Sequence, residues 1–405
     1  MLTSQAVILC GGRGTRLGPI TSSLPKPMAP VCGRPFLAHL LGQLKDNGFQ
    51  EVVLLIGYLG HIIEDYFGDG KNFGLKIQYS RGPLEWDTGR RLWEARDLLH
   101  DHFLLLYSDN YATFFRERIE RTYEKQGVLG CLSVHPRPEK NNVRLSPDGF
   151  VTEYDSTRRA PGLNAIEIGY ALFSKKIFSF YDAPDCNFNE IILKLVQAGQ
   201  VCAHVALDRY YSVSDPERLK ITQDYFTPKK ILLIDRDGTL NRKAPRGEYV
   251  SRWEDFAFIP GTIEALAAMA KLGYNFIVIS NQAGVGRGVL TESQVWGIDR
   301  QMVGALAIHG VTILRSYYCF HHWEDNCEFR KPKPGLLLRA SQDFLFQLPQ
   351  TWFIGDDPRD CTAAWEAGCR AAYVGNEEEL ATLPLDQRPA LVLSELSGVI
   401  QALQP

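Results

Sequence analysis

The sequence predicts an α/β protein of two domains, and three observations lead to this fold class. The chain has 405 residues, which is more than one ordinary hydrophobic core organises. Short apolar runs rich in β-branched residues alternate with longer segments of helical period, as in a parallel sheet covered by helices. After the polar stretch FTPKK, a new apolar strand opens with ILLID. We therefore place the domains at residues 1–228 and 229–405.

The composition excludes several classes of protein. Hydrophobic residues make up 45% and charged residues 22% of the chain, and the formal net charge is −3. These values fit a globular protein and argue against a disordered chain or a basic nucleic-acid binder. No apolar run is long enough to span a bilayer, and MLTSQAVIL carries no basic leader. We therefore expect a cytoplasmic protein with neither nucleic acid nor a membrane as partner, and reduced rather than disulfide-bonded cysteines.

The elements of the first half follow one another in the order strand, helix, strand, helix. The strand AVILC is followed by a helical segment around His39 to Asn47, then by the strand EVVLLIG and a helical segment over Ile62 to Phe67. The short apolar runs fit buried strands, and the longer periodic segments fit helices that cover them. The last stretch, from about Glu377, mixes Leu, Glu and Pro and is expected to form closing helices and turns.

Two carboxylates, Asp235 and Asp237, follow the buried strand ILLI in the second half. If the chain stays extended there, both side chains point to the same side of the sheet and can share one cation. Gly238 then lets the backbone turn away. Such a pair suits phosphoryl transfer, because one oxygen attacks phosphorus while a neighbouring group handles the proton of the leaving group. The alternative is a solvated Asp-x-Asp-Gly turn.

Two further strands of the second half also end in polar groups. FIVIS ends at Ser280 and continues into NQAGVGRG, whose hydroxyl, amide and backbone N–H groups can hold phosphate oxygens. RKPKPG supplies Arg330 and Lys331, and TWFIG leads into DDPRD, which begins at Asp356. Because open α/β sheets bind ligands at the carboxyl ends of their strands, we expect nucleophile, phosphate-binding groups and metal carboxylate in one crevice.

These motifs carry a specific resemblance. DRDGTLN, SNQAGVGRG, RKPKPG and GDDPRD, in this order, resemble the four motifs of the haloacid dehalogenase (HAD) phosphatase superfamily. DRDGTLN followed by EYV and FIPGTIEAL resembles more narrowly the branch that holds heptose-bisphosphate phosphatases and histidinol-phosphate phosphatases. The resemblance covers Ile231 to Gly375. It implies a HAD-like, doubly wound parallel sheet and a Mg²⁺-dependent phosphatase that forms an aspartyl-phosphate.

The resemblance also implies a role for each matching residue. Asp235 would be the nucleophile, and Asp237 the general acid and base. Ser280 and Lys331 would bind the transferring phosphate, while Mg²⁺ would be held by Asp235, Asp356 and the carbonyl group of Asp237. The residues expected to contact the substrate are Asn281, Arg287 and Arg330.

The same branch often carries a structural zinc loop. CFHHWEDNCEFRKP matches the spacing of that loop with Cys319, His321 and Cys327, but the fourth ligand position is Phe329, which cannot bind a metal. Either Zn²⁺ is retained with His322 or a water as the fourth ligand, or the loop keeps its shape by packing its aromatic side chains.

A glycine-rich segment, GGRGTRLGPITSSLPKPMAPV, follows the first strand. Glycines let backbone amides approach a phosphate chain, and cations supply the charge that a triphosphate and its departing pyrophosphate require. The expected nucleotide-binding and catalytic residues of this segment are Gly11, Gly12, Arg13, Gly14, Thr15, Arg16 and Lys26.

This segment resembles the signature of sugar-1-phosphate nucleotidyltransferases, and the resemblance covers roughly Ala6 to Phe226. It implies a Rossmann-like domain with the base near the first two glycines, Arg16 and Lys26 as catalytic cations, and Asp109 as a metal ligand. LNAIEIGYALF is similar to the sugar-binding strand of that family and places Glu167 near the expected polar position.

Two later landmarks depart from the nucleotidyltransferase pattern. Where relatives have leucine-glycine-threonine followed by small residues, PLEWDTGRRL places Arg90 and Arg91 near the base and sugar pocket. In RYYSVSDPERL, Ser212 takes the place of a second metal carboxylate, with Asp208 or Asp215 as replacements. The alternative is an intact fold whose transferase activity is weak or lost.

Together the two halves suggest consecutive steps of one route. In the route that the resemblance implies, D-glycero-D-manno-heptose 1,7-bisphosphate loses its 7-phosphate, and the heptose 1-phosphate then reacts with a nucleoside triphosphate, for which GTP is preferred. The partners are therefore sugar phosphates and a nucleoside triphosphate, and a homo-oligomer is compatible with the sequence. One alternative is a histidinol-phosphate or other sugar-phosphate phosphatase joined to a hexose-1-phosphate nucleotidyltransferase. Another is a phosphatase joined to a sugar-nucleotide-binding module.

Overall fold

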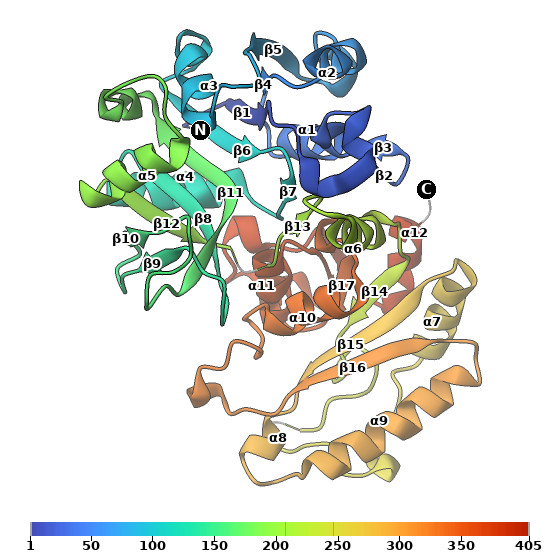
Figure 1. Ribbon diagram of the computed structural model, residues 1–405. Helices are drawn as coiled ribbons and strands as arrows, with labels where there is room; N and C mark the ends of the chain where they lie inside the picture. Colours follow the sequence, from blue (N-terminus) through green and yellow to red (C-terminus); the bar gives the residue numbers. More distant parts are fainter. Residues whose placement is uncertain (1, 207, 246, 404–405) are drawn as a thin grey trace. The chain divides into compact units, whose positions relative to one another are not determined.

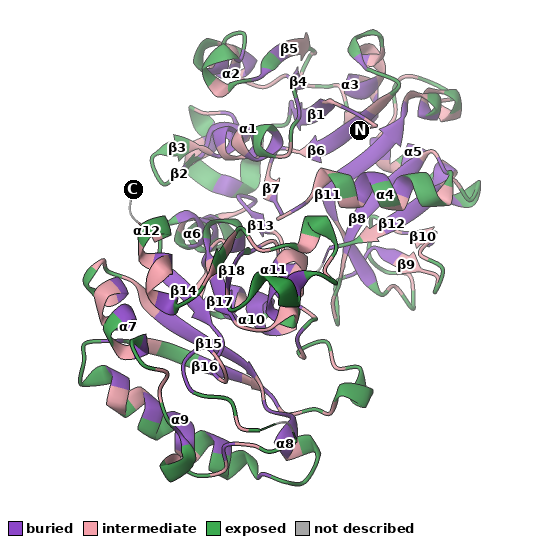
Figure 2. Cartoon of the chain, turned by 180° about the vertical axis from the view of Figure 1, so that it is seen from behind, coloured by how far each residue is buried: buried purple, intermediate pink, exposed green. Residues whose placement is uncertain are grey.

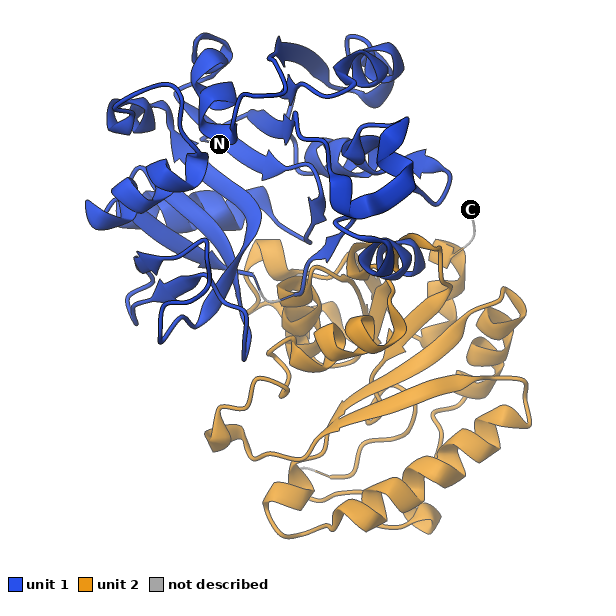
Figure 3. Ribbon diagram, viewed as in Figure 1, with its two compact units in different colours: residues 1–224 blue, residues 225–405 orange. Residues whose placement is uncertain are grey.

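The structure is a computed structural model, and it describes residues 2–206, 208–245 and 247–403 (Figure 1). The chain divides into two compact units, Met1–Asp224 and Tyr225–Pro405 (Figure 3), whereas the sequence analysis placed the boundary between residues 228 and 229. Each unit has a sheet with helices and a core of its own, so the predicted α/β fold class is confirmed. Among the described residues, no helix is both long and apolar enough to cross a bilayer.

The first unit is built on a nine-stranded sheet in which β8 pairs with β11 and β12 beside the path β10-β9-β11-β6-β1-β4-β5. β1 pairs in parallel with β4 and β6, and β4 with β5, but β11 runs antiparallel to β6 and β8. The first half of the sheet, where the sequence predicted strand-helix alternation, is therefore all parallel, whereas the second half is mixed, because β12 pairs in parallel with β8. The strands are β1 (Gln5–Cys10), β4 (Glu51–Ile56), β5 (Lys76–Arg81), β6 (His102–Tyr107), β8 (Gly130–Pro136), β9 (Val143–Leu145), β10 (Val151–Tyr154), β11 (Ala165–Ser174) and β12 (Val201–Val205).

Helices and two small sheets complete the first unit. Helices α1 and α2 lie where the periodic segments predicted them, and α5 begins with a capping box formed by Asn187 and Glu190. The helices are α1 (Phe36–Asp46), α2 (Gly60–Phe67), α3 (Thr88–Glu94), α4 (Arg116–Gln126), α5 (Phe188–Gln197) and α6 (Pro216–Phe226). The small sheets pair β2 (Pro30–Val31) with β3 (Arg34–Pro35) and β7 (Asn110–Tyr111) with β13 (Tyr211–Ser212).

The second unit is built on a six-stranded parallel sheet in the order β16-β15-β14-β17-β18-β19. Its central strand follows the predicted apolar run ILLI. The strands are β14 (Ile231–Ile234), β15 (Asn275–Asn281), β16 (Ile313–Cys319), β17 (Trp352–Gly355), β18 (Arg370–Val374) and β19 (Leu391–Leu393). β19 corrects the expectation that the last stretch forms only helices and turns. It has 3 residues, and its pairing with β18 rather than a local pattern makes it a strand.

Helices cover both faces of this second sheet. Leu233 and Ile277 pack into one core cluster with α10 and α11, while Leu232 and Phe276 pack into another with α7 and α9 (Figure 1). Because successive strand residues point to opposite faces, both faces are buried, as Figure 2 shows along β15. The predicted doubly wound arrangement is therefore present. The helices are α7 (Thr262–Lys271), α8 (Ala283–Gly286), α9 (Glu292–Ala307), α10 (Gly335–Phe344), α11 (Pro358–Ala367) and α12 (Val399–Leu403).

Candidate active sites

Three carboxylates meet at the carboxyl edge of the second sheet. Asp235 directly follows β14, Asp356 directly follows β17, and Asp360 lies in the first turn of α11. One carboxylate oxygen of each lies within 4.8 Å of the others, an arrangement that can hold a metal ion. The backbone N–H of Asp235 donates to the carbonyl oxygen of Ile354 at 2.8 Å, which fixes the strand end. The first two of these carboxylates are the metal ligands expected from the sequence, whereas Asp360 has no expected role.

Lys331 is the buried cation of this carboxylate group. Its Nζ lies 2.9 Å from Oδ1 of Asp235 and 2.7 Å from Oδ1 of Asp360, and it donates to the carbonyl oxygen of Ile279 at 3.1 Å. Burial disfavours the charge on Lys331, but the two carboxylates outweigh burial and raise its pKa. Burial raises the pKa of Asp360 to about 7, against the opposing charge of Lys331. A fixed ammonium group therefore stands beside the proposed nucleophile.

Asp356 is held by two residues that the sequence analysis did not single out. The hydroxyl group of Thr239 donates to Oδ1 of Asp356 at 3.0 Å, and Lys243 forms an ion pair with its Oδ2. Burial raises the pKa of Asp356, and the charge of Asp235 adds to this effect. Lys243 stands in RKAPRG, between DRDGTLN and EYV, where no spacing pattern marks it. Only the folded chain brings this cation to the carboxylates.

The carboxylate of Asp237 lies outside the three-carboxylate group, which corrects the expectation that its side chain shares a cation with Asp235. It accepts hydrogen bonds from Arg236 Nη2 at 2.8 Å, Asn241 Nδ2 at 2.9 Å and Gln282 Nε2 at 2.6 Å. Burial raises the pKa of Asp237, but the charge of Arg236 outweighs it and the net pKa is lowered. The chain leaves the extended conformation after β14, so the alternation assumed from the sequence does not continue.

Ser280 and Asn281 connect the end of β15 to this site. Gln282 Nε2 donates to Ser280 Oγ at 3.2 Å as well as to Asp237, so the amide group joins the hydroxyl and the carboxylate. Asn281 Nδ2 donates to the carbonyl oxygen of Lys331 at 3.0 Å, and the N–H of Lys331 donates back to Asn281 Oδ1 at 3.1 Å. The two expected phosphate-binding segments are thus tied to each other.

The other two expected substrate contacts lie beside the loop that follows β16. Arg287 donates to the phenol oxygen of Tyr249 at 3.2 Å, and its guanidinium carbon lies 5.8 Å from the centre of the Trp323 ring. Arg330 donates to the carbonyl oxygen of His321 at 3.2 Å. The first contact is a side-chain hydrogen bond with a cation–π arrangement, and the second fixes the backbone of the loop.

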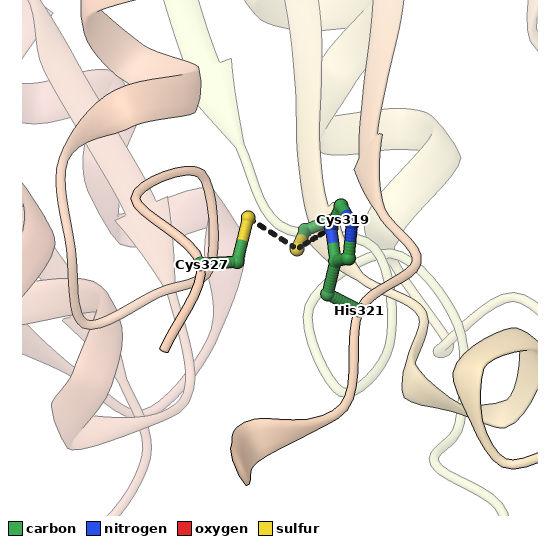
Figure 4. Close-up of side chains that lie close together, drawn as sticks. All are labelled: Cys319, His321 and Cys327. Atoms are coloured by element: carbon green, nitrogen blue, oxygen red, sulfur yellow. Dashed lines mark hydrogen bonds between the residues drawn. The ribbon is translucent and has the colours of Figure 1, made fainter. Parts of the chain in front are cut away.

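Three expected zinc ligands gather in that loop. Cys319 Sγ lies 4.0 Å from Cys327 Sγ and 3.9 Å from His321 Nδ1 (Figure 4). Among the described residues, His322 is not part of this group, and its Nδ1 instead accepts a hydrogen bond from the N–H of Glu324 at 3.3 Å. Of the two aromatic side chains of the packing alternative, Phe329 is 47% exposed, while the ring of Trp323 lies 3.5 Å from that of His322, centroid to centroid. The side chains available as zinc ligands in this group are therefore two thiols and one imidazole.

The first unit has a cavity of about 450 Å³ at its glycine-rich loop. Lys26 forms an ion pair with Asp109, and the hydroxyl group of Ser214 donates to Asp109 Oδ2 at 3.2 Å. Thr15 and Arg16, at the start of a 3₁₀ helix (Thr15–Ser22), are exposed and are not among the described residues that line this cavity. The expected residues that do line it are Gly11, Gly12, Arg13, Gly14, Lys26 and Asp109.

Arg91 forms part of the wall of this cavity. Its buried guanidinium donates to the carbonyl oxygens of Ile56 at 3.0 Å and Pro83 at 2.6 Å, and burial lowers its pKa. A Cβ atom built on Gly11 would lie 2.3 Å from Arg91 Cζ, so any larger residue there would require the Arg91 side chain to shift. Arg90, in contrast, pairs with Glu94 at 2.6 Å and is not one of the described lining residues.

Glu167 and Ser212 occupy different surroundings from those expected. Burial raises the pKa of Glu167 to about 7, and the charge of Asp109 adds to this, yet Glu167 is absent from the described lining of the cavity. The hydroxyl group of Ser212 accepts a hydrogen bond from Arg218 at 3.5 Å, and Asp215 accepts one from the N–H of Arg218 at 2.9 Å. Within the described part of the first unit, no group of three or more metal-binding side chains forms.

Comparisons with known families match each unit separately. A nucleotidyl transferase family matches residues 5–144, and a HAD-hydrolase-like family matches residues 328–399. The putative glucose-1-phosphate thymidylyltransferase of Bacillus anthracis, solved with sucrose, has a TM-score of 0.50 and 18% identity over 54% of this chain and 93% of its own. This likeness shows the fold alone. The chain therefore combines a unit that matches the nucleotidyl transferase family with a HAD-type phosphatase unit.

Comparison with curated proteins identifies the family of the phosphatase unit more specifically. The D-glycero-beta-D-manno-heptose-1,7-bisphosphate 7-phosphatase of Photorhabdus laumondii is 32% identical over 180 residues, which cover 43% of this chain and 94% of that protein. The protein of the same name from Pasteurella multocida is 38% identical over 141 residues, which cover 33% of this chain and 75% of that protein. Through its phosphatase unit the chain belongs to this family. The predicted fusion of the two classes is confirmed.

Proposed function

We propose that the chain catalyses two consecutive steps of sugar-nucleotide synthesis. The second unit removes the 7-phosphate of D-glycero-D-manno-heptose 1,7-bisphosphate, and the first unit transfers a nucleotidyl group, from GTP by preference, to the heptose 1-phosphate. The observation that carries the proposal is the buried group of Asp235, Asp356 and Asp360 with Lys331 beside it. The names of the relatives that match the phosphatase unit support the choice of substrate.

In the phosphatase reaction, a carboxylate oxygen of Asp235 attacks phosphorus, the bond from phosphorus to the sugar oxygen breaks, and the sugar oxygen takes a proton from Asp237. Lys331 and Ser280 stabilise the negative charge of the transferring phosphoryl group. Asp237 is the general acid and base, and because Arg236 lowers its pKa, its ionised form suits the second step, in which it removes a proton from the attacking water. Mg²⁺, held by Asp235, Asp356 and the carbonyl group of Asp237, would neutralise charge on the phosphoryl oxygens.

In the nucleotidyl transfer, an oxygen of the sugar phosphate attacks the α-phosphorus and pyrophosphate leaves. The glycine loop brings backbone N–H groups to the phosphates, and Lys26 and Arg16 supply positive charge for the pentavalent arrangement. Asp109 is the proposed metal ligand of this site. Lys26 is the better supported of the two cations, because it lines the cavity, whereas Arg16 is exposed and does not.

One observation favours a second candidate for the first unit. Ser212 replaces an expected carboxylate, and no three-ligand metal group forms in the described part of this unit. The first unit would then bind a sugar nucleotide without rapid catalysis, as a module that serves the phosphatase. Release of pyrophosphate separates the two candidates.

The test is to incubate the purified chain with heptose bisphosphate, Mg²⁺ and each common nucleoside triphosphate in turn. Phosphate, pyrophosphate and nucleotide sugar are measured separately, and heptose 1-phosphate is also supplied directly. Phosphate release from the bisphosphate, followed by pyrophosphate release with GTP, is expected. A clear preference for histidinol phosphate over the bisphosphate would remove the proposed phosphatase substrate. Binding of a nucleotide sugar without pyrophosphate release would favour the binding module.

We also propose that Cys319, His321 and Cys327 hold a structural Zn²⁺, with water as the fourth ligand. Two thiolates and an imidazole suit this metal, and their approach in Figure 4 is the supporting observation. Metal analysis of protein purified without chelators should give about one Zn²⁺ per chain for this single site. Cys327→Ser should lower the zinc content, whereas Cys361→Ser, at a buried cysteine outside the loop, should leave it unchanged. Clearly sub-stoichiometric zinc in the unaltered chain would contradict the site.

A further inference from the structure

A second cavity of the first unit carries a strongly positive lining. It has a volume of about 290 Å³ and lies among the ends of β8, β11 and β13 and the helix α6. None of the described residues that line it is acidic. The basic residues among those that line it are His135, Arg137, Arg209 and Arg218.

The positive charge in this second cavity is only partly neutralised. Arg218 forms an ion pair with Asp215 at 3.4 Å, but the guanidinium of Arg137 has no carboxylate within ion-pair distance among the described residues. The Nε of Arg137 is buried and has no hydrogen-bond partner there. Burial lowers the pKa of Arg137, Tyr210 opposes this effect, and the positive charges of Arg158 and Arg218 lower the pKa further. A bound anion would offset the repulsion between these like charges.

This second cavity is distinct from the one at the glycine-rich loop. The two share none of their described lining residues. In the pairing of β11 with β8, Ile166 lies opposite His135 and Glu167 lies opposite Val134. Because successive strand residues point to opposite faces, Ile166 and His135 face the second cavity while Glu167 faces the side on which Asp109 influences it. Glu167, whose pKa responds to Asp109 of the first cavity, therefore does not face the second one.

We propose that this second cavity is a binding site for the phosphate group of a small phosphorylated molecule. Guanidinium groups match phosphate in geometry and charge, and Tyr210 adds a neutral hydroxyl group. The volume lies at the lower end of the range for ligand sites and suits inorganic phosphate or a sugar phosphate better than a nucleoside triphosphate. The proposal does not depend on the reactions proposed for the two active sites.

Protection of arginines from chemical modification tests the proposal residue by residue. The full chain is treated with phenylglyoxal in EDTA, with chloride at constant ionic strength, with inorganic phosphate, or with glucose 1-phosphate, and modified peptides are quantified by mass spectrometry. At about ten times the Kd, ligand should slow modification of Arg137 and Arg218 by about tenfold, and should leave exposed Arg121 on α4 unchanged. Stronger protection by glucose 1-phosphate identifies an ester, and stronger protection by inorganic phosphate identifies the free ion. Equal rates with and without either ligand would overturn the site.

A titration by calorimetry supplies the second measurement. Arg137→Gln/Arg218→Gln should bind one glucose 1-phosphate fewer than the unaltered chain. Arg121→Gln/Lys125→Gln, which removes the same charge from exposed positions of α4, should keep the full stoichiometry. If the first double variant does not fold, as judged by circular dichroism, Arg218→Gln alone replaces it, because this guanidinium is partly exposed. An unchanged stoichiometry in a folded variant would refute the proposal.

Discussion

The Nζ atom of Lys331 lies 2.9 Å from Oδ1 of Asp235, and both side chains are buried. The two residues come from the ends of segments about a hundred positions apart in the chain. A buried carboxylate needs a compensating charge, and here the compensating group is also the one proposed to bind the transferring phosphate. We therefore expect stability and catalysis in the second unit to depend on the same pair.

Replacing Lys331 by methionine should damage both properties. Lys331→Met leaves Asp235 and Asp360 close together without their shared cation, so the free energy of unfolding of the second unit should fall by about 3–5 kcal/mol. Phosphate release should fall by about 100- to 1,000-fold. Denaturant unfolding and a phosphate assay measure the two effects. Lys333→Met, which removes an exposed ion pair with Glu328, should change stability by less than about 1 kcal/mol, and similar losses in both variants would contradict the assignment.

The two proposed reactions should be separable by single substitutions. Asp235→Asn removes the nucleophile and should reduce phosphate release to below about 1% of the unaltered chain, while pyrophosphate release from added heptose 1-phosphate persists. Lys26→Ala should do the reverse and lower pyrophosphate release by about 100-fold. Both products are measured in each variant. Loss of both products in either folded variant would count against two independent sites.

Magnesium should stabilise the second unit through its three carboxylates. Binding to the folded state alone should raise the melting temperature by about 5 °C when Mg²⁺ is present at about 100 times its Kd. Asp356→Asn removes one negative charge from the group and should at least halve this rise, whereas Asp386→Asn, at an exposed position, should keep it. Differential scanning calorimetry with Mg²⁺ and with EDTA gives the comparison. A rise of equal size in both variants would place the cation elsewhere.

Two neighbouring glycines of the first unit should respond differently to alanine. A Cβ atom at Gly11 would lie 2.3 Å from the buried guanidinium of Arg91, while a Cβ atom at Gly12 would have no atom within 4 Å. Gly11→Ala should therefore lower the free energy of unfolding of the first unit by about 1–3 kcal/mol. Gly12→Ala should change it little. Denaturant unfolding monitored by circular dichroism tests the pair, and equal stabilities would show that Arg91 moves aside freely.

The stability of the first unit should fall between pH 7 and pH 5 because of His204. Burial, helped by the charge of Arg118, lowers the pKa of His204 from 6.5 to about 4. The unfolded chain therefore binds a proton that the folded chain does not, so this stability is present above pH 6.5 and is lost as the pH falls toward 4. At pH 5 the loss from this residue should be about 2 kcal/mol.

His204→Gln provides the comparison for the pH effect. The variant lacks the titrating group. Between pH 7 and pH 5, its free energy of unfolding should therefore fall by about 2 kcal/mol less than that of the unaltered chain. His309→Gln, in the second unit, serves as the control and should retain the pH dependence of the unaltered chain. If His204→Gln shows the full dependence, another group is responsible.

Local sequence was enough for the fold class and for most of the parallel strands. Short apolar runs such as AVILC and ILLID predict buried strands from local sequence alone, and the segments between them have the length and period of helices. The motifs also identified the two families, because phosphate-binding loops need particular residues at fixed spacing. The short strand β19 and the mixed half of the first sheet were missed, since they depend on pairing with distant strands rather than on a local pattern.

The sequence by itself determined which segments are expected to carry the chemistry: the glycine loop, the aspartates after β14 and β17, and the lysine in RKPKPG. Only the tertiary structure decided how their side chains are grouped. It turned Asp237 toward Arg236, placed Asp360 beside Lys331 and brought Lys243 to Asp356. These groupings depend on where the backbone turns after each strand and on how buried charges find partners. Both are settled by the packing of the whole unit, not by neighbours in the chain.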